Sequence, residues 1–435
     1  MAVFTPAEWY RIFFTPSPDA CPAPQVEVLE MIFSRKSLSS SSMSTRPEDL
    51  RSRFKWSVDS DREDSEEKMP TREKGYDQFI KLSVSAVSGL IFGMALEKGR
   101  VFEPHIIRQQ MLFSNFTMLK MFLSASATGM LAFSILTMIP RTSRRMEKAL
   151  FAYFPGLKYK GVLAAAVGGA FLGMGMTLAG ACPGMVLAQV GAGVPNSVLT
   201  LAGGICGAFL YALTEPLTSI WFKPVRSYRY NTLDEYLETP YFILALPFAA
   251  LLGLVVFAAE VFRPWETEVI QSGSGVFGVR AWPPYITGMI IGLLQIPVVL
   301  VIQDTLGSSA SYVTVASQVL IFERLNRVLP YLKKYTTGIG NWWQVFYVFS
   351  AIAGARISAT TSNTVGTVEG LEEWYSFGGG VLMIYGARLA GGCTSGHGLS
   401  GMGLLVLLSF VAVPSMFAGG ISLAFLMKYK LGVAM

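Results

Sequence analysis

Long apolar stretches are the feature of this sequence that most restricts its fold. Crossing the roughly 30 Å hydrocarbon core of a bilayer takes about 20 helical residues, and stretches of that order recur from residue 79 onward. In hydrocarbon, only helices and closed barrels pair all of their backbone groups. We predict an all-α membrane protein of about nine transmembrane spans, near 79–96, 118–139, 161–180, 196–216, 241–262, 283–303, 342–358, 374–390 and 403–427.

Composition supports the membrane assignment and excludes several classes of protein. Only 15% of the residues are charged, against about 25% in soluble domains. The 43 glycines recur inside the apolar stretches, where they allow membrane helices to pack closely. The net charge of +6 is typical of basic loops that orient a membrane protein, so we predict contact with the lipid bilayer and not with nucleic acid. The four cysteines form no metal-ligand spacing, and we predict neither a metal nor another cofactor.

The chain divides into four predicted parts. Residues 1–75 contain a serine run and an alternating charged stretch with little apolar periodicity, so we expect a disordered polar tail in which Cys21 has no role. A first transmembrane repeat is predicted over 76–240 and a connecting span over 241–262. A second transmembrane repeat follows over 263–435.

Basic residues predict the orientation of the chain. Placing the N-terminus in the cytosol puts three cation-rich loops inside, as the positive-inside rule requires. Lys98, Arg100 and Arg108 in the first outer loop fit this orientation least well. We expect a multi-pass protein of the plasma membrane rather than of an organelle. The inner loops carry Arg141, Arg144, Arg145, Lys148, Lys158 and Lys160, then Lys223, Arg226 and Arg229, then Arg324, Arg327, Lys333 and Lys334.

An internal repeat is the strongest signal in the sequence. The segment GGAFLGMGMTLAGAC at 168–182 aligns without gaps to GGVLMIYGARLAGGC at 379–393, with seven of fifteen positions identical. Four predicted spans precede the central span at 241–262 and four follow it, so the second repeat is inverted relative to the first. Transporters with inverted repeats bind their substrates near the bilayer midplane, between discontinuous helices. We therefore predict re-entrant half-helices at the two cysteine segments, entering from opposite faces.

Cys182 and Cys393, which occupy equivalent positions in the repeat, are the main candidates for a substrate pathway. Cys182 precedes a predicted turn at Pro183 and Gly184, where exposed backbone N–H groups favour anions. A thiol is a weak donor with a polarizable sulfur, which suits a sulfur-bearing ligand. The alternative is that both cysteines only pack where helices cross.

The second cysteine segment adds hydroxyl groups to this candidate pathway. Thr394 and Ser395 begin a predicted turn with Gly396, directly after the cysteine. Together with Ser400, they are predicted to line the pathway as neutral hydrogen-bond donors.

Two titratable residues flank the same segment. Arg388 lies in an apolar stretch, and an ionisable group at membrane depth indicates function; it either attracts an anion or pairs with Glu372, Glu373 or Asp304. His397 either donates to an anion and lowers the pKa of the nearby thiol, or caps the loop. The sequence leaves both choices open.

Other polar residues offer little chemistry. Cys206 has Ser422 as its counterpart in a weaker repeat match, AGGICGAFL against AGGISLAFL, and we interpret it as a packing residue. His105 and His397 are the two histidines of the chain. The sequence therefore offers few candidates for the histidine of a Ser/His/Asp catalytic triad. We predict a protein that is not an enzyme.

The motifs GACPGMVLAQVGAG and GARLAGGCTSGHGLSG resemble the paired signatures of the YeeE/YedE family, over roughly residues 79–427. The resemblance implies an hourglass-shaped inverted repeat that takes up thiosulfate, with cysteines passing the ion along by S–H···S hydrogen bonds. Cys182 and Cys393 match two of those cysteines. Bacterial members carry a further cysteine after the first span, where this chain reads EKGRVFEP with Phe102 and Glu103.

Three hypotheses follow for the function. The first is transport of thiosulfate or a related sulfur anion through a cysteine-lined path. The second is a membrane-embedded redox or sulfur-transfer protein, in which the cysteines exchange sulfur covalently with a soluble sulfur-carrier protein. The third is a scaffold or sensor whose cysteines only pack. The sequence favours the first.

Overall fold

The computed structural model describes residues 71–154, 157, 160–222, 230–321 and 329–433. In this part of the chain it contains helices and loops but no β-strand, and one isolated bridge pairs Thr232 with Val406. The predicted all-α architecture is therefore confirmed. Most of the predicted polar tail, including Cys21, lies outside the described residues, and the first described helix begins at Thr71.

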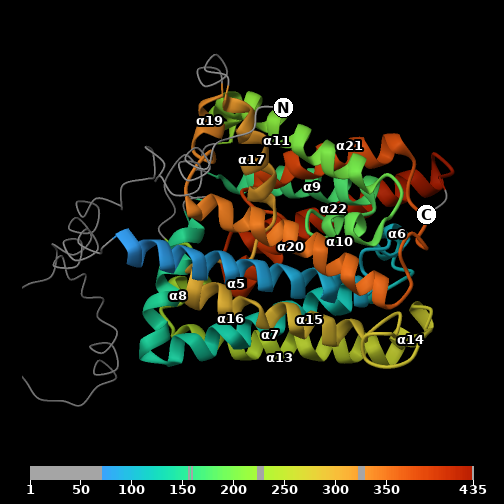
Figure 1. Cartoon of the computed structure of the whole chain (residues 1–435), viewed down its shortest axis with the longest axis horizontal. Helices are drawn as coiled ribbons and strands as arrows, with labels where there is room; N and C mark the ends of the chain where they lie inside the picture. The colour runs from blue at the N-terminus through green and yellow to red at the C-terminus, as the bar shows by residue number, and fades with distance from the viewer. Residues whose placement is uncertain (1–70, 155–156, 158–159, 223–229, 322–328, 434–435) are drawn as a thin grey trace, which may run out of the picture.

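The long helices lie side by side and form one bundle (Figure 1). In chain order the main helices are α5 (Thr71–Lys98), α6 (Pro104–Met111), α7 (Thr117–Met138), α8 (Pro140–Tyr153), α9 (Val162–Ala179), α10 (Met185–Ala192), α11 (Ser197–Trp221), α13 (Tyr241–Phe262), α15 (Pro284–Leu293), α17 (Ser309–Ser317), α20 (Ile339–Thr361), α21 (Glu373–Ala390) and α22 (Ser409–Tyr429). Shorter elements are α12 (Leu233–Tyr236), α14 (Trp265–Glu268), α16 (Gln295–Pro297), the π-helix η3 (Val298–Ile302), the 3-10 helix η4 (Gln318–Ile321), α19 (Pro330–Lys333) and the π-helix η5 (Thr394–Gly401).

Seven helical stretches among the described residues are long and apolar enough to cross a membrane: α5, α7, α9, α11, α13, α15 continued through η3, and α22. The other two predicted spans, near 342–358 and 374–390, form α20 and α21, with 23 and 18 residues. At 1.5 Å per residue these helices are about 34 and 27 Å long. Both pack against several neighbouring helices, so their sequences need less apolar surface than those of helices that face lipid.

The last predicted span, near 403–427, begins later in the structure. Helix α22 starts at Ser409 and continues through Pro414 as one helix. The residues before it belong to η5 and a short connection. Pro414 lies in the second turn of α22, where few hydrogen bonds of the helix precede it.

Glycines set how closely the helices pack. Gly89 and Gly93 of α5 lie against the backbone of Tyr347 and Ala351 of α20. A Cβ atom on either glycine would collide with that backbone. Both residue numbers rise together, so α5 and α20 run parallel. Three further parallel pairs follow the same pattern: Gly288 and Gly292 of α15 on α7, Gly169 and Gly173 of α9 on α22, and Gly203 and Gly207 of α11 on α21.

Helices α9 and α21, which carry the two cysteine motifs at their C-terminal ends, pack against each other in the opposite sense. Gly168 lies against Ala390, and Gly175 lies against Met383. As the numbers rise on α9 they fall on α21, so this pair is antiparallel. A side chain on either glycine would force the two helices apart.

Helix α13 lies at the edge of the bundle beside α7 (Figure 1). Lys120 of α7 is buried and pairs with Glu260 at 3.0 Å and with Glu268 at 3.1 Å. Glu268 also accepts a hydrogen bond from the backbone N–H of Phe116, at 2.8 Å. These charged contacts attach the end of α13 to the first repeat.

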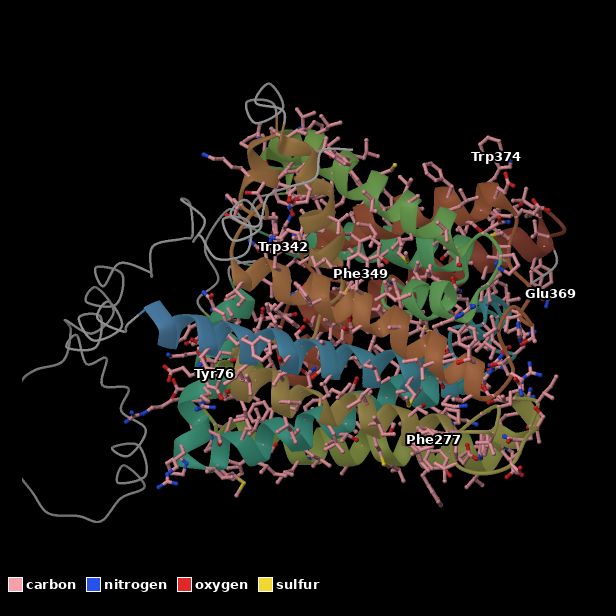
Figure 2. The ribbon with its side chains drawn as sticks, viewed as in Figure 1. Tyr76, Phe277, Trp342, Phe349, Glu369 and Trp374 are labelled. Carbon is pink, nitrogen blue, oxygen red and sulfur yellow. The ribbon has the colours of Figure 1, made fainter. Side chains whose placement is uncertain are left out.

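Different helices lie at the two ends of the bundle. The start of α5, α8 and α19 lie at one end, here called the α8 end, whereas α6 and α14 lie at the other (Figure 1). Tyr76 at the α8 end and Trp374 at the opposite end stand out from the bundle (Figure 2) and are 69% and 86% exposed. Exposed aromatic residues at both ends are typical of the two membrane–water interfaces.

The glycine contacts give a stability prediction. A Cβ atom at Gly175 would lie 2.5 Å from the Cα of Met383, so we expect Gly175→Ala to lower the stability by about 1–3 kcal/mol. At Gly253 on α13 nothing lies within 4 Å. Gly253→Ala should leave stability unchanged or raise it slightly, because alanine favours the helix. Thermal unfolding in detergent measures both, and equal effects would contradict the packing assigned to α9 and α21.

Candidate functional site

The first cysteine segment connects the end of α9 to the start of α10. Helix α9 ends at Ala179, and Gly180 takes a left-handed conformation (φ +55°) against Pro104. Cys182 follows and is 8% exposed, and the backbone N–H groups of Gly184 and Met185, at the start of α10, face its sulfur. The predicted break after α9 is therefore present, with a buried thiol at the N-terminus of a short helix.

The second cysteine segment begins in the same way. Helix α21 ends at Ala390, and Gly391 is left-handed (φ +90°), as its repeat counterpart Gly180 is. Cys393 is 1% exposed, and its sulfur lies 3.2 Å from the Ser395 hydroxyl oxygen. The Cys393 thiol is thus surrounded by polar donors in an otherwise apolar core.

The turn predicted at Thr394, Ser395 and Gly396 differs from the structure. These residues begin the π-helix η5, which continues to Gly401. Its glycines bring the backbone directly against neighbouring side chains, with Gly398 under the Phe122 ring. This wide helical turn, rather than an open loop, carries the second cysteine segment.

A third segment brings the two cysteine segments together. The Ser308 hydroxyl lies 3.7 Å from the Cys393 sulfur and next to the position that a Cβ atom on Gly184 would take. One turn later the Tyr312 hydroxyl donates to the Pro183 carbonyl at 2.8 Å. Ser308 and Tyr312 belong to the start of α17, so α17 contacts both cysteine segments.

Ser308 and Tyr312 were not among the residues predicted to line the site. The available signal is GSSASYVTVAS at 307–317, a run of small hydroxyl residues directly after an apolar span. Small polar residues at that place indicate a polar path or a buried hydrogen-bond network.

Matching side chains hold the two cysteine segments in place. Gln189, seven residues after Cys182, donates to the carbonyls of Phe102 at 2.8 Å and Gly180 at 2.9 Å. Ser400, seven residues after Cys393, donates to the carbonyl of Leu306 at 2.8 Å. Phe102 follows α5, and Leu306 follows α15 and η3.

A glutamine completes the second of these networks. Gln295 donates to the Ser400 hydroxyl at 2.9 Å and accepts from the backbone N–H of Leu306 at 3.2 Å. Ser400 was predicted to line the pathway. Its hydroxyl instead accepts from Gln295 and donates to Leu306, so it holds the second cysteine segment against these residues.

His397 is buried and engaged by the protein through both ring nitrogens. Nε2 lies 3.2 Å from the Ala390 carbonyl, and Nδ1 lies 3.0 Å from the Ser409 hydroxyl. A carbonyl only accepts, so Nε2 carries the hydrogen and Nδ1 accepts from Ser409. In this state His397 links the end of α21 to the start of α22.

Thr394 is also buried, and its hydroxyl points at two thioethers. The sulfurs of Met176 on α9 and Met416 on α22 lie 3.4 and 3.5 Å from its oxygen. These weak acceptors leave the hydroxyl free to exchange partners at little cost.

Arg388 contacts tyrosines rather than the acids considered from the sequence. Its Nε and Nη2 atoms donate to the Tyr331 hydroxyl at 2.9 and 2.6 Å, and Nη2 donates to the Tyr335 hydroxyl at 2.8 Å. Within the described residues it forms no ion pair with Glu372, Glu373 or Asp304. Asp304 instead accepts from the Trp343 indole at 3.0 Å.

Two residues singled out from the sequence lie away from this site. Cys206 is exposed on α11, and Ser422 is exposed on α22, where its hydroxyl donates to the Ala418 carbonyl at 2.7 Å. Phe102, at the place of the further bacterial cysteine, is fully buried, with the Arg100 guanidinium 4.8 Å from its ring centroid. Cys182 and Cys393 are thus the two buried thiols among the described residues.

Comparisons with known proteins identify relatives of this chain. Residues 98–422 match the family described as sulphur transport. The chain is similar to the Thiosulfate transporter TsuA of Spirochaeta thermophila, at 24% identity over 360 residues, which cover 78% of this chain and 97% of that protein. It is similar as well to the Thiosulfate transporter TsuA of Escherichia coli, at 22% identity over 362 residues, which cover 78% of this chain and 93% of that protein.

The network around Ser400 gives a prediction that a double-mutant cycle tests. Gln295 and Ser400 share a hydrogen bond and the Leu306 backbone. We expect Gln295→Leu and Ser400→Ala each to destabilise the protein by about 1–3 kcal/mol, with a coupling energy of about 0.5–3 kcal/mol between them. Thermal unfolding of the four proteins in detergent measures the coupling.

The matched control combines Gln295→Leu with Gln189→Leu, because these glutamines share no hydrogen-bond partner. Their effects should add. Additive effects for the Gln295 and Ser400 pair as well would contradict the network.

Proposed function

This chain belongs to the sulphur transport family, and we propose that it carries thiosulfate, or a closely related inorganic sulfur anion, across a membrane past Cys182 and Cys393. The predicted resemblance to the YeeE/YedE family is confirmed. The observation that carries the proposal is the convergence of both cysteine segments on α17, through Ser308 and Tyr312. Both thiols are buried within the bundle.

The chemistry of the site suits a soft, doubly charged ion. Backbone N–H groups at the start of α10 and the hydroxyls of Ser308 and Ser395 supply donors without a fixed positive charge. Such donors hold an anion weakly enough to release it, which conduction requires. A thiol near each end of the site can donate to the terminal sulfur of thiosulfate, which sulfate lacks.

We also propose that the bundle is an inverted repeat. Gly168 lies against Ala390, and their counterparts Gly379 and Ala179 lie against each other; both counterparts are offset by 211 residues. The parallel pairs correspond too, since α5 on α20 matches α15 on α7, and α9 on α22 matches α21 on α11. A two-fold axis across the bundle relates every one of these contacts.

We propose nine crossings, and the same contacts support this number. If the chain crosses the membrane at α5, α7, α9, α11, α13, α15 with η3, α20, α21 and α22, alternate helices run in opposite directions. Every parallel and antiparallel pair then has the sense observed. The C-terminal end of α22 lies opposite the start of α5, as an odd number requires (Figure 1). We propose that the α8 end faces the cytosol, because α8 with Arg141, Arg144 and Arg145 and α19 with Lys333 lie there (Figure 1), and that the membrane is the plasma membrane.

Uptake of labelled thiosulfate into proteoliposomes tests the proposed function. We expect saturable uptake by the native protein and a fall of about tenfold or more in Cys182→Ala and in Cys393→Ala, since a hydrogen bond to a charged group contributes roughly 1.5–3 kcal/mol. Cys206→Ala on the lipid face is the matched control and should transport normally.

Uptake that is unaffected by both substitutions would reduce the two cysteines to packing residues. A folded native protein that shows no uptake but accumulates persulfide on Cys182 or Cys393 would favour sulfur transfer to a carrier protein instead. Mass spectrometry of the purified protein distinguishes that outcome.

A further inference from the structure

A group of cations and tyrosines lies beside the end of α21, where the second cysteine segment begins. We call Lys160, Tyr211, Tyr331, Tyr335 and Arg388 the tyrosine–cation cluster. Lys160 precedes α9, Tyr211 belongs to α11, and Arg388 lies on the last turn of α21, five residues before the cysteine. Tyr331 lies in α19 and Tyr335 just after it, at the α8 end (Figure 1).

The cluster is continuous from one cation to the other. Lys160 donates a hydrogen bond to the Tyr211 hydroxyl, and its Nζ lies 4.7 Å from the centroid of the same ring. The rings of Tyr211 and Tyr331 meet edge to face with centroids 5.2 Å apart, and Tyr331 lies 5.4 Å from Tyr335. Tyr331 and Tyr335 both accept from Arg388.

Neither cation of this cluster forms an ion pair with an acid among the described residues. Glu215, on the helix of Tyr211, lies near enough to attract Lys160 but not to pair with it. The buried Arg100, by contrast, pairs with Glu97 at 2.9 Å, whereas the buried Arg108 donates to the carbonyls of Thr177 and Leu178. Two like charges held together in a partly buried site repel each other, and a bound anion would relieve this cost.

The hydroxyl groups favour the same ligand. A tyrosine oxygen that accepts from Arg388 still carries its own O–H donor, so the tyrosines both hold the guanidinium and offer donors of their own. A planar guanidinium beside an ammonium and several phenol groups matches the oxygens of a tetrahedral oxyanion.

We propose that the tyrosine–cation cluster is a second anion site, which selects by charge and oxygen atoms and therefore binds sulfate as well as thiosulfate. The proposal deepens the proposed function and rests on it for the role of the site in transport. The two thiols, Cys182 and Cys393, then distinguish thiosulfate from sulfate. Sulfate should occupy the cluster and compete with thiosulfate without being carried.

Equilibrium binding of labelled sulfate to the purified full-length protein tests the proposal without requiring transport. We expect saturable binding that unlabelled thiosulfate displaces, and a loss of affinity of about tenfold or more in Arg388→Gln. Lys160→Gln and Tyr335→Phe should each weaken binding by a smaller factor, and they keep the test decisive if Arg388→Gln does not fold. Lys428→Gln is the control, since Lys428 lies 5.5 Å from the Tyr429 ring centroid outside the cluster.

Each outcome separates the two proposals. Sulfate binding that persists in Cys393→Ala, while thiosulfate uptake is lost, supports a charge-selective site distinct from the thiols. Sulfate binding by a protein that carries no thiosulfate would overturn the proposed function and keep the anion site. Absence of sulfate binding to the folded native protein, or full binding in both Arg388→Gln and Lys160→Gln, would overturn the anion site.

Discussion

The pairing of backbone polar groups at two helix breaks is the constraint on which the rest of this structure depends. A break at membrane depth exposes N–H and C=O groups that hydrocarbon cannot satisfy. Here Gln189 takes up the carbonyls of Phe102 and Gly180, and Ser400 takes up that of Leu306. Side chains of the protein thus replace water at each break, which allows irregular backbone and buried thiols to exist inside an apolar bundle.

Close packing of the antiparallel helices α9 and α21 places the break at the end of each helix beside the N-terminal part of the other, with Ala390 against Gly168 and Ala179 against Gly379. Each cysteine segment then follows a left-handed glycine and is held by a side chain seven residues after its cysteine. The differences between them, such as Ser308 beside Cys393, then arise from the segments packed against them.

The all-α architecture and the helix breaks at Gly180 and Gly391 could be predicted from the sequence, because each depends on residues that are close together in the chain. The sequence did not reveal Ser308 or Tyr312, whose contacts join residues 85 and 129 positions apart. It also left open the partners of Arg388 and His397. A buried polar group has many candidate partners in a sequence, and only the packing of distant helices selects among them.

The central claim is that a sulfur anion binds between the two thiols, at the convergence of the cysteine segments. A cryo-EM structure of the protein in lipid nanodiscs with thiosulfate tests it most directly. The account predicts density for the ion within hydrogen-bonding distance of Cys182, Cys393 or both, beside Ser308. Thiosulfate density in a path that avoids both thiols, with the cysteine segments still packed against α17, would contradict it.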